Sequence, residues 1–493
     1  MSLSLTNSEH WYTAYEAASA KQQYDMLLEA IAQPLSPELI EELDLGMILL
    51  VMRDELVNNN LLDQAIHFIQ TLQEKQPDLY QQEFPFFDNL LVEYYLFHNQ
   101  PEQARSALMR FMINPADDID QTLAVLDYLK FYDATDLAVE LSSAAYEPVR
   151  TSSKVLPGVE IEFSRVILNH QIQQAYRSLK NGEVIDWDAF LAEAVKYGYE
   201  NTLKWVNEIH HHLISDIESN PEFLTQFKRD RDAVLRALST EFCRSMLEQK
   251  QTSFVCSYAL WQELVHFLES RDLPRKQLSQ PDLYFTIHQS DLDRYVAQKI
   301  GGLLSTQQAV GFAILWGIPY IYDWLQSKQM IQDEVYKQAI AVATALKTQL
   351  VEGFKPLWKY NFIHRWLPPD SIPTTEFDAE TKEFAASLDQ VTPLSEESGH
   401  SMKKTLLNSL APFVSPEMLQ AFDEAEDEAI EAMPFEQDAD GEDGEDAPTP
   451  TWVDPPIRSF KPEKPRKSAL KLASELPTEG KKPANKSKKK KKR

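Results

Sequence analysis

The amino-acid sequence predicts an all-α protein, and three observations support this fold class. Apolar residues recur at three- and four-residue spacing along most of the chain, whereas no alternating β pattern exceeds a few residues. Glycine is scarce, with 13 of 493 residues, where average usage would give about 34. Alanine recurs at one position of the helical pattern: Ala65, Ala104 and Ala138 each stand early in a helix-like stretch. We therefore expect a body built from repeated helices.

The first segment, residues 1–39, predicts one or two short helices. Leu27 and Ile31 are spaced as on one helix face, and Pro34 and Pro37 interrupt the pattern.

Residues 40–150 predict three antiparallel helix pairs. Ala104 and Ala138 are 34 residues apart, and Ala65 precedes Ala104 by 39. A stacked helix pair needs a small residue where its backbones come closest, so each alanine is expected at a tight crossing. Large apolar residues recur at fixed offsets from these alanines: Met52, Leu56 and Ile69 in the first unit, Leu91, Tyr95 and Leu108 in the second, and Val125 and Leu129 in the third. We expect Pro77, Pro115 and Pro148 to end the second helix of each pair.

This pattern resembles degenerate tetratricopeptide repeats, whose period is 34 residues. It departs from the family at the glycine of the first helix, where Arg53, Val92 and Leu126 stand instead, and Ser142 replaces a usual aromatic. The resemblance implies a solenoid-like stack whose concave surface holds a peptide or a partner helix.

Residues 151–367 predict a further helical region. A helix is expected from about Glu160 to Leu179, and Asp186 is placed to cap the helix that follows the turn at 181–182. Further helical patterns span 221–242, 254–267 and 332–358.

The apolar run Ala309–Tyr322 has 14 residues. A helix that spans a membrane needs about 20 residues, so we expect a buried core helix, ended by Pro319, and no transmembrane segment. A partner-binding groove is the alternative for this run.

Aromatic and cysteine residues are expected in the core. The aromatic residues cluster after the last long helix: Phe354, Trp358, Tyr360, Phe362 and Trp366. The two cysteines, Cys243 and Cys256, stand among apolar neighbours, at a spacing that suits neither a metal site nor a disulfide framework. Because the first twelve residues also lack a signal-peptide pattern, we expect a cytoplasmic protein, or a nuclear one if the cell is eukaryotic.

The character of the chain changes at about residue 368. Residues 368–433 are expected to be mostly irregular, with short helices at 402–410 and 415–432. Residues 434–493 are charged, rich in proline and poor in aliphatic side chains, and this composition predicts a disordered tail.

The tail carries an acidic run followed by a separate basic run. Residues 423–446 contain 13 acidic and no basic residues, whereas residues 458–493 contain 15 Lys or Arg against 3 Glu. Residues 1–422 have a net charge of −26. The candidate contacts for a polyanion or an acidic partner are therefore Lys488, Lys489, Lys490, Lys491, Lys492 and Arg493. Self-pairing with the acidic run and simple solubility are the alternatives.

No pattern in the sequence indicates catalysis. His210, His211 and His212 are consecutive, so on a helix they point in different directions and cannot share one metal ion. Asp230 and Asp232, which alternate with Arg229 and Arg231, predict a solvated helix face. We expect neither a cofactor nor a metal.

The sequence thus favours a non-catalytic protein-interaction scaffold or adaptor. The alternative is an accessory factor that contacts nucleic acid or the ribosome through the lysine-rich tail. The third candidate is a helical enzyme whose catalytic residues come from distant helices.

The tail provides a first prediction. RNA binding, measured by fluorescence anisotropy, should be weak, independent of sequence and steeply salt-dependent, because each neutralised phosphate contributes a slope of about −0.7 to −0.9 in log affinity against log salt. Deletion of residues 423–446 should tighten binding, since the acidic run competes for the lysines, and a variant with Lys488–Lys492 changed to Ser should bind less. If all three proteins bind alike, or none binds at low salt, the tail is not a polyanion contact.

Overall fold

The fold is all-helical over the part of the chain that the structure describes. The computed structural model describes residues 8–199, 202–271, 273–274, 279–300, 307–354 and 357–396. No strand occurs within these ranges. All of them belong to one compact unit, Met1–Asp440. The helices predicted at 402–410 and 415–432 and the disordered tail predicted at 434–493 lie outside the described residues.

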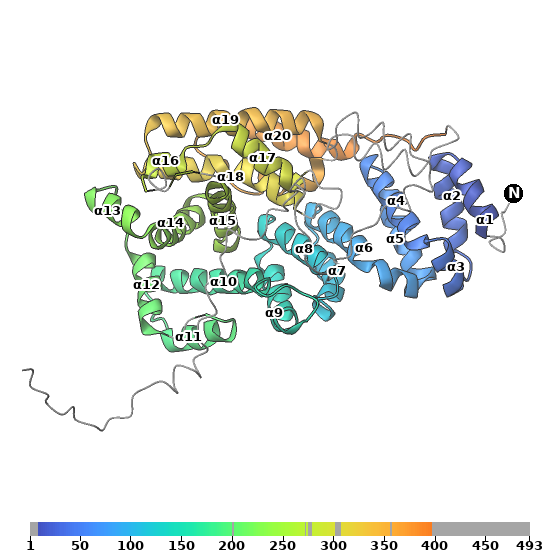
Figure 1. Cartoon of the computed structure of the whole chain (residues 1–493), viewed down its shortest axis with the longest axis horizontal. Helices are drawn as coiled ribbons and strands as arrows, with labels where there is room; N and C mark the ends of the chain where they lie inside the picture. Colours follow the sequence, from blue (N-terminus) through green and yellow to red (C-terminus); the bar gives the residue numbers. More distant parts are fainter. Residues whose placement is uncertain are drawn as a thin grey trace, which may run out of the picture. The chain divides into compact units, whose positions relative to one another are not determined.

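The first half of the unit contains nine helices among its described residues (Figure 1). Three precede the predicted repeats: α1 (Ser8–Ala17), α2 (Ala20–Ile31) and α3 (Pro37–Glu42). Six form the predicted pairs: α4 (Leu45–Asn58) with α5 (Leu62–Lys75), α6 (Pro77–Phe97) with α7 (Pro101–Ile113), and α8 (Ile119–Phe131) with α9 (Thr135–Thr151).

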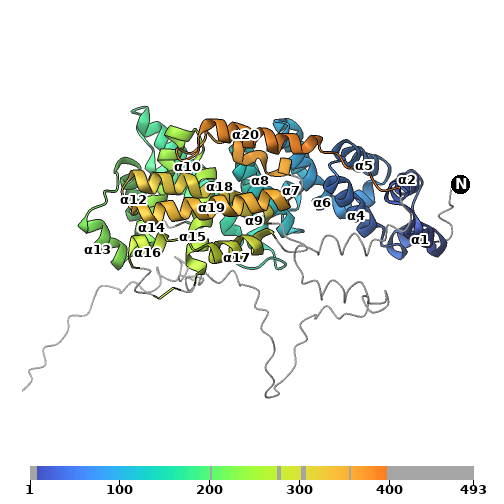
Figure 2. The same ribbon diagram turned by 90° about the horizontal axis from the view of Figure 1, so that it is seen from above.

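The second half adds longer helices and short turns of helix. They are α10 (Glu160–Lys180), α11 (Trp187–Lys196), α12 (Leu203–Ile214), α13 (Pro221–Arg229), α14 (Arg231–Ser245), a π-helical turn η1 (Met246–Lys250), α15 (Phe254–Ser270), α16 (Pro281–Phe285), α17 (Gln289–Ile300), α18 (Gln308–Ser327), α19 (Asp333–Gly353), the 3₁₀ segment η2 (Leu357–His364), α20 (Thr374–Ala386) and the short 3₁₀ turn η3 (Ser387–Asp389). Figure 2 shows α18 and α19 lying along one another, and the two helices are in contact.

The three helix pairs share one turn geometry. A residue in the left-handed region follows the first helix of each pair: Asn60 (φ 56°), Asn99 (φ 55°) and Asp133 (φ 57°). Asn and Asp are the non-glycine residues that adopt this conformation most readily. In each turn the next backbone N–H donates to the carbonyl five residues back: Leu61 to Leu56 at 2.8 Å, Gln100 to Tyr95 at 2.8 Å and Ala134 to Leu129 at 2.9 Å. This is the Schellman arrangement, and it turns the chain back along the helix it has left.

The three alanines lie where the repeat predicts. Ala65, Ala104 and Ala138 each follow the left-handed residue by five positions, and all three are fully buried. The two helices of each pair are in contact. Residues 45–151 therefore contain three helix pairs.

The proline predictions are only partly correct. Pro77 opens α6 directly after α5 ends, and Pro115 lies between α7 and α8. Pro148, however, lies inside α9, and Pro319 lies inside α18 rather than at its end. A proline inside a helix removes one backbone hydrogen bond. The helices continue because buried side chains on both sides of each proline, such as Ile318 and Tyr320, hold the chain in place.

The apolar run Ala309–Tyr322 is a buried helix, as predicted. Every residue of this run is buried within α18. Among the described helices, none is both long and apolar enough to cross a membrane.

Three helix predictions need correction. The pattern at 221–242 is two helices, because Asp230 ends α13 and caps α14 by accepting a hydrogen bond from the Ala233 N–H at 3.1 Å. The helix predicted to reach Trp358 ends at Gly353, which is a poor helix former. Helix α20 was not predicted, because it buries only Phe377 and Phe384 and so shows little periodicity.

Helix α8 connects the helix pairs to the second half of the unit. It contacts α6 and α9 from the pairs, and also α15, α18 and η2. The aromatic residues predicted for the core lie here: Trp358, Tyr360, Phe362 and Trp366 are buried, and Phe354 packs against them partly buried.

The crossing in the second pair generates a prediction. Ala104→Leu should overpack the contact between α6 and α7 and lower the free energy of unfolding by about 1–3 kcal/mol. Urea denaturation would measure the change. Ala192→Leu, at an exposed position of α11, is the matched control and should leave stability nearly unchanged; equal stability of the two variants would contradict a tight crossing at Ala104.

Candidate functional site

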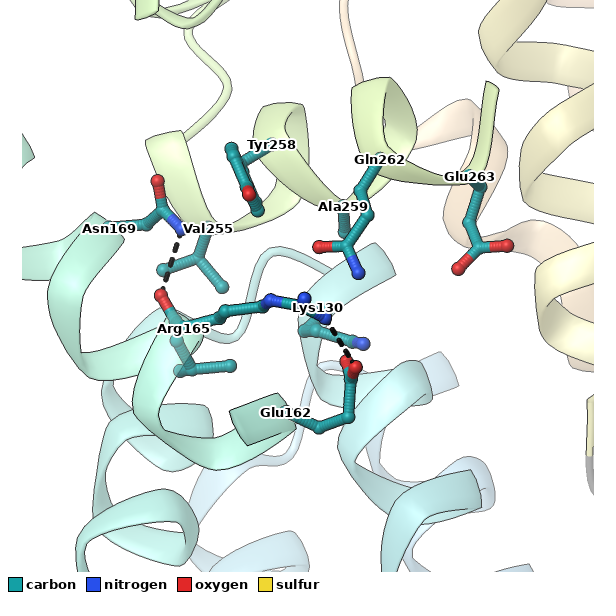
Figure 3. Close-up of a pocket in the computed structure, with 10 residues that line it drawn as sticks. Lys130, Glu162, Arg165, Asn169, Val255, Tyr258, Ala259, Gln262 and Glu263 are labelled. Atoms are coloured by element: carbon teal, nitrogen blue, oxygen red, sulfur yellow. Dashed lines mark hydrogen bonds and ion pairs between the residues drawn. The ribbon is translucent and has the colours of Figure 1, made fainter. Parts of the chain in front are cut away.

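A charged cleft lies where α8, α10 and α15 meet (Figure 3). Its charged lining residues are Lys130 from α8, Glu162 and Arg165 from α10, and Glu263 from α15. Figure 3 shows Gln262, also from α15, pointing toward the same space. Charged and polar side chains from three helices thus converge in one small cleft.

Each charge in the cleft has a partner of opposite sign. Lys130 Nζ lies 2.6 Å from Asp127 Oδ1, and Arg165 Nη1 lies 2.5 Å from Glu162 Oε1.

Glu263 is held by α17 and by its own helix. The Tyr295 hydroxyl of α17 donates to Glu263 Oε2 at 3.2 Å, and Lys299 Nζ lies 4.0 Å from the same oxygen. His266 Nδ1 lies 3.6 Å from Glu263 Oε1.

The ionisation of the cleft follows from this pairing. Burial alone would raise the pKa of Glu263, but Lys299, His266 and Lys130 outweigh it and hold the pKa at about 2. Burial would lower the pKa of Lys130, yet Asp127 and Glu162 raise it above its usual value. Both groups therefore stay charged at neutral pH, whereas a general acid or base works best with a pKa near the working pH.

The cleft is also small. Its volume of about 20 Å³ is enough for about one water molecule. Small-molecule sites have volumes of about 300–1,000 Å³. The cleft therefore suits a set of ion pairs better than it suits an organic substrate.

Part of the surface of α6 and α8 is covered by a later segment of the chain. The backbone carbonyl of Phe131 accepts a hydrogen bond from Trp366 Nε1 at 3.0 Å, and that of Phe97 accepts one from Arg365 Nη2 at 2.8 Å. Lys359 Nζ lies 2.9 Å from the buried carboxylate of Glu93. The segment 357–366 therefore binds α6, α8 and the turns that follow them.

A later part of the chain, residues 387–392, contacts the first helix pair. Asn60 Nδ2 donates to the carbonyls of Ser387 at 2.9 Å and of Gln390 at 3.1 Å. The Thr392 N–H donates to the Asn59 carbonyl at 2.9 Å. All three turns of the helix pairs thus contact residues 357–392.

The structure does not describe the site residues that the sequence predicts. Lys488, Lys489, Lys490, Lys491, Lys492 and Arg493 all lie outside the described residues. The two cysteines are buried and free, as expected for small core residues.

The three histidines have separate environments on α12. His210 packs against the Trp187 ring at 5.2 Å, and His211 Nδ1 lies 3.1 Å from Ser215 Oγ. Burial lowers the pKa of His212. Within the described ranges, no group of three or more His, Cys, Asp or Glu could hold a metal ion.

The surroundings of Arg231 differ from the solvated helix face that the sequence predicts. Instead of lying on a solvated face, its guanidinium lies 5.1 Å from the centre of the Tyr284 ring and 3.7 Å from Glu269 Oε1. Tertiary contact with α16 and α15 explains the difference.

No pattern that the sequence offers predicts the charged cleft. The available signal was local: Asp127 with Lys130 and Glu162 with Arg165 are opposite charges three residues apart on helices. Such pairs are common on exposed helix faces, so their spacing alone does not indicate burial.

Comparisons with protein-family models, with curated proteins and with solved structures found no match.

The cleft generates a prediction about stability and pH. Lowering the Glu263 pKa from 4.5 to about 2 corresponds to about 3 kcal/mol, at about 1.4 kcal/mol per pKa unit. Because the folded-state pKa is depressed, this contribution is present above pH 4.5 and is lost as the pH falls toward 2. Glu263→Gln should therefore destabilise the protein by about that amount at pH 7 and flatten its pH dependence below pH 4.5.

Denaturation at pH 7 and pH 3 would measure this effect. Glu147→Gln, which breaks the exposed pair between Glu147 and Arg150, is the control and should have little effect at either pH. An equal loss for both variants at pH 7 would show that the Glu263 network adds nothing beyond a surface pair.

Proposed function

We propose that this protein is a non-catalytic scaffold or adaptor that binds protein partners through its helices. The observation that carries the proposal is the threefold recurrence of one helix pair, with the same left-handed turn at Asn60, Asn99 and Asp133. Stacked helix pairs present extended surfaces, and proteins that resemble tetratricopeptide repeats use such surfaces for binding. The transfer of that role to this chain is an analogy of fold.

The chain's own segment limits where a partner can bind. Residues 357–366 contact α6 and α8, and α15 and α18 also contact α8. A peptide in the manner of the tetratricopeptide family would have to displace this segment. We therefore place the partner on helices that the chain leaves uncovered.

A second candidate function is supported by the charge distribution. Six basic residues, Lys488–Arg493, follow a body of net charge −26 over residues 1–422. Such a run can neutralise phosphates without recognising bases, as an accessory factor of the ribosome or of nucleic acid would require.

A helical enzyme is the third candidate, and the charged cleft is where its chemistry would be sought. The cleft offers about 20 Å³ and groups that stay ionised at neutral pH. These properties favour the scaffold.

Affinity capture separates the first two functions. The full chain, a chain without residues 434–493 and a full chain with Lys488–Lys492 changed to Ser would each be used, with and without nuclease. A scaffold should retain the same protein partners in all samples, because its contacts lie on the helical body. If the captured proteins are lost on nuclease treatment and with both tail variants, the accessory-factor function replaces the scaffold.

A further inference from the structure

The last described residues, 390–396, form a strap that has neither helix nor strand. The strap follows η3 and runs from α20 past the turn between α4 and α5 to α2 (Figures 1 and 2). Most of its residues are exposed, and only Leu394, 8% exposed, is buried. The strap therefore differs from residues 357–366, whose aromatic side chains lie in the core.

The turn between α4 and α5 binds the first part of the strap through backbone atoms. The Thr392 N–H donates to the Asn59 carbonyl at 2.9 Å, and Asn60 Nδ2 donates to the Gln390 carbonyl at 3.1 Å. Neither contact involves a side chain of the strap. The turn thus recognises a peptide backbone.

The start of α2 binds the last part of the strap. The capping box of α2 satisfies the N–H groups of Ser19 and Gln22, while the Lys21 N–H donates to the Ser395 carbonyl at 3.2 Å. Lys21 Nζ also lies 3.0 Å from Glu396 Oε1. Because the first N–H groups of a helix have no intrahelical partner, a carbonyl from the strap completes the start of α2.

These two sets of contacts belong to one surface. Thr392 and Ser395 are three residues apart, and a fully extended chain covers at most about 11 Å over that length. Leu394 lies between them in sequence and joins the main hydrophobic core. The α4–α5 turn, the contacts of Leu394 and the start of α2 together form what we call the strap seat.

Few contacts hold the strap on its seat. Ordering each residue of a chain costs conformational entropy, which buried contacts must offset. The strap offers one buried side chain and an ion pair whose side chains are 57% and 79% exposed, and such exposed pairs contribute little. A segment with so few buried contacts opens more readily than the helices beside it.

We propose that the strap is an internal ligand of the strap seat, and that a segment of a protein partner takes its place. The partner segment is non-helical and carries a leucine two residues before a carboxylate. Main-chain hydrogen bonds with a pocket for one side chain are what surfaces that bind extended peptides use. The proposal rests on the scaffold function and adds to it a surface that is uncovered only when the strap leaves.

A second copy of the chain is the alternative occupant. It would place its own strap on the seat, as in domain swapping. The chain's own strap, however, follows the short η3 turn directly, so its effective concentration at the seat exceeds that of a strap from another molecule. The two straps have the same contacts, and a partner segment with better contacts competes more strongly than a second copy.

The test uses the full chain and a defined probe. The probe is a fluorescein-labelled, amidated peptide with the sequence of residues 390–396, and binding is followed by anisotropy. In the variant Leu394→Asp the new charge is costly to bury, so the strap is released. This variant should bind the probe at least about tenfold more tightly than the unmodified chain, whose own strap competes.

The matched control changes an exposed residue of the same strap. Val391 is 51% exposed, so Val391→Asp should bind the probe as weakly as the unmodified chain. A probe with Asp in place of its leucine should bind the Leu394→Asp variant at least about tenfold more weakly than the original probe. If Leu394→Asp does not bind the probe, or all three proteins bind it alike, the proposal fails.

A charge reversal tests whether the probe lies on the strap seat. Leu394→Asp alone should prefer the original probe, whereas Lys21→Glu added to it should prefer a probe with Lys in place of the glutamate. Lys21 is an exposed residue, so far-ultraviolet circular dichroism should match for all proteins. An unchanged preference would show that the probe binds elsewhere and would overturn the proposal.

Hydrogen exchange tests the strap in the unmodified chain, without any substitution. The Thr392 amide should exchange at least about a hundredfold faster than the amides of the buried run 309–322 in α18. Equal protection of these amides would show that the strap is a fixed part of the core, and the proposal would fail.

Sedimentation covers the second copy. A dimer of the unmodified chain that Leu394→Asp abolishes would show that straps exchange between two molecules, and this result would replace the partner with a second copy.

The proposal and the scaffold function fail separately. If the affinity capture above retains protein partners but Leu394→Asp does not bind the probe, the scaffold stands and the strap seat is not its binding surface. If no sample captures a protein while Leu394→Asp binds the probe, the strap seat stands as a peptide site and the scaffold function fails.

Discussion

The pairing of buried charges around α8 is the constraint on which the rest of the structure depends. Helix α8 contacts α6, α9, α15, α18 and η2, so a charged residue on it has little access to water. Lys130 and Asp127 are nevertheless on this helix, only 13% and 15% exposed, and they pair at 2.6 Å. An unpaired charge in this position would cost several kcal/mol. Glu162 of α10 and Glu263 of α15 line the same cleft as Lys130, and Lys299 of α17 lies beside Glu263.

The second half of the unit lies against the helix pairs mainly through α8, which contacts α15, α18 and η2. Helix α18 contributes a wholly buried apolar run, and α15 brings Glu263 to the edge of the same interface. Residues 357–366 then cover α6 and α8, with Trp366 and Arg365 donating to carbonyls at the ends of those helices. Helix ends leave carbonyls without intrahelical partners, so these donors satisfy groups that burial would otherwise penalise.

The consequence for function is a separation of covered and uncovered surfaces. Residues 357–366 lie against α6 and α8 and cover part of their surface. Val184, Leu203 and Ile214, in and beside α11 and α12, remain exposed.

The sequence by itself determined the features that depend on neighbouring residues. Apolar spacing and scarce glycine indicated the all-α class. A small residue is required wherever two helices cross, so Ala65, Ala104 and Ala138 marked the three pairs. Tertiary structure alone decided the features that depend on distant residues. Pro148 and Pro319 remain inside helices although each lacks a backbone N–H, and Glu263 of α15 stays charged because Lys299 of α17 lies beside it. The physical reason is the range of the interactions: helix formation and turn geometry act over five or fewer residues, whereas the partner of Glu263 comes from another helix, 36 residues further along the chain.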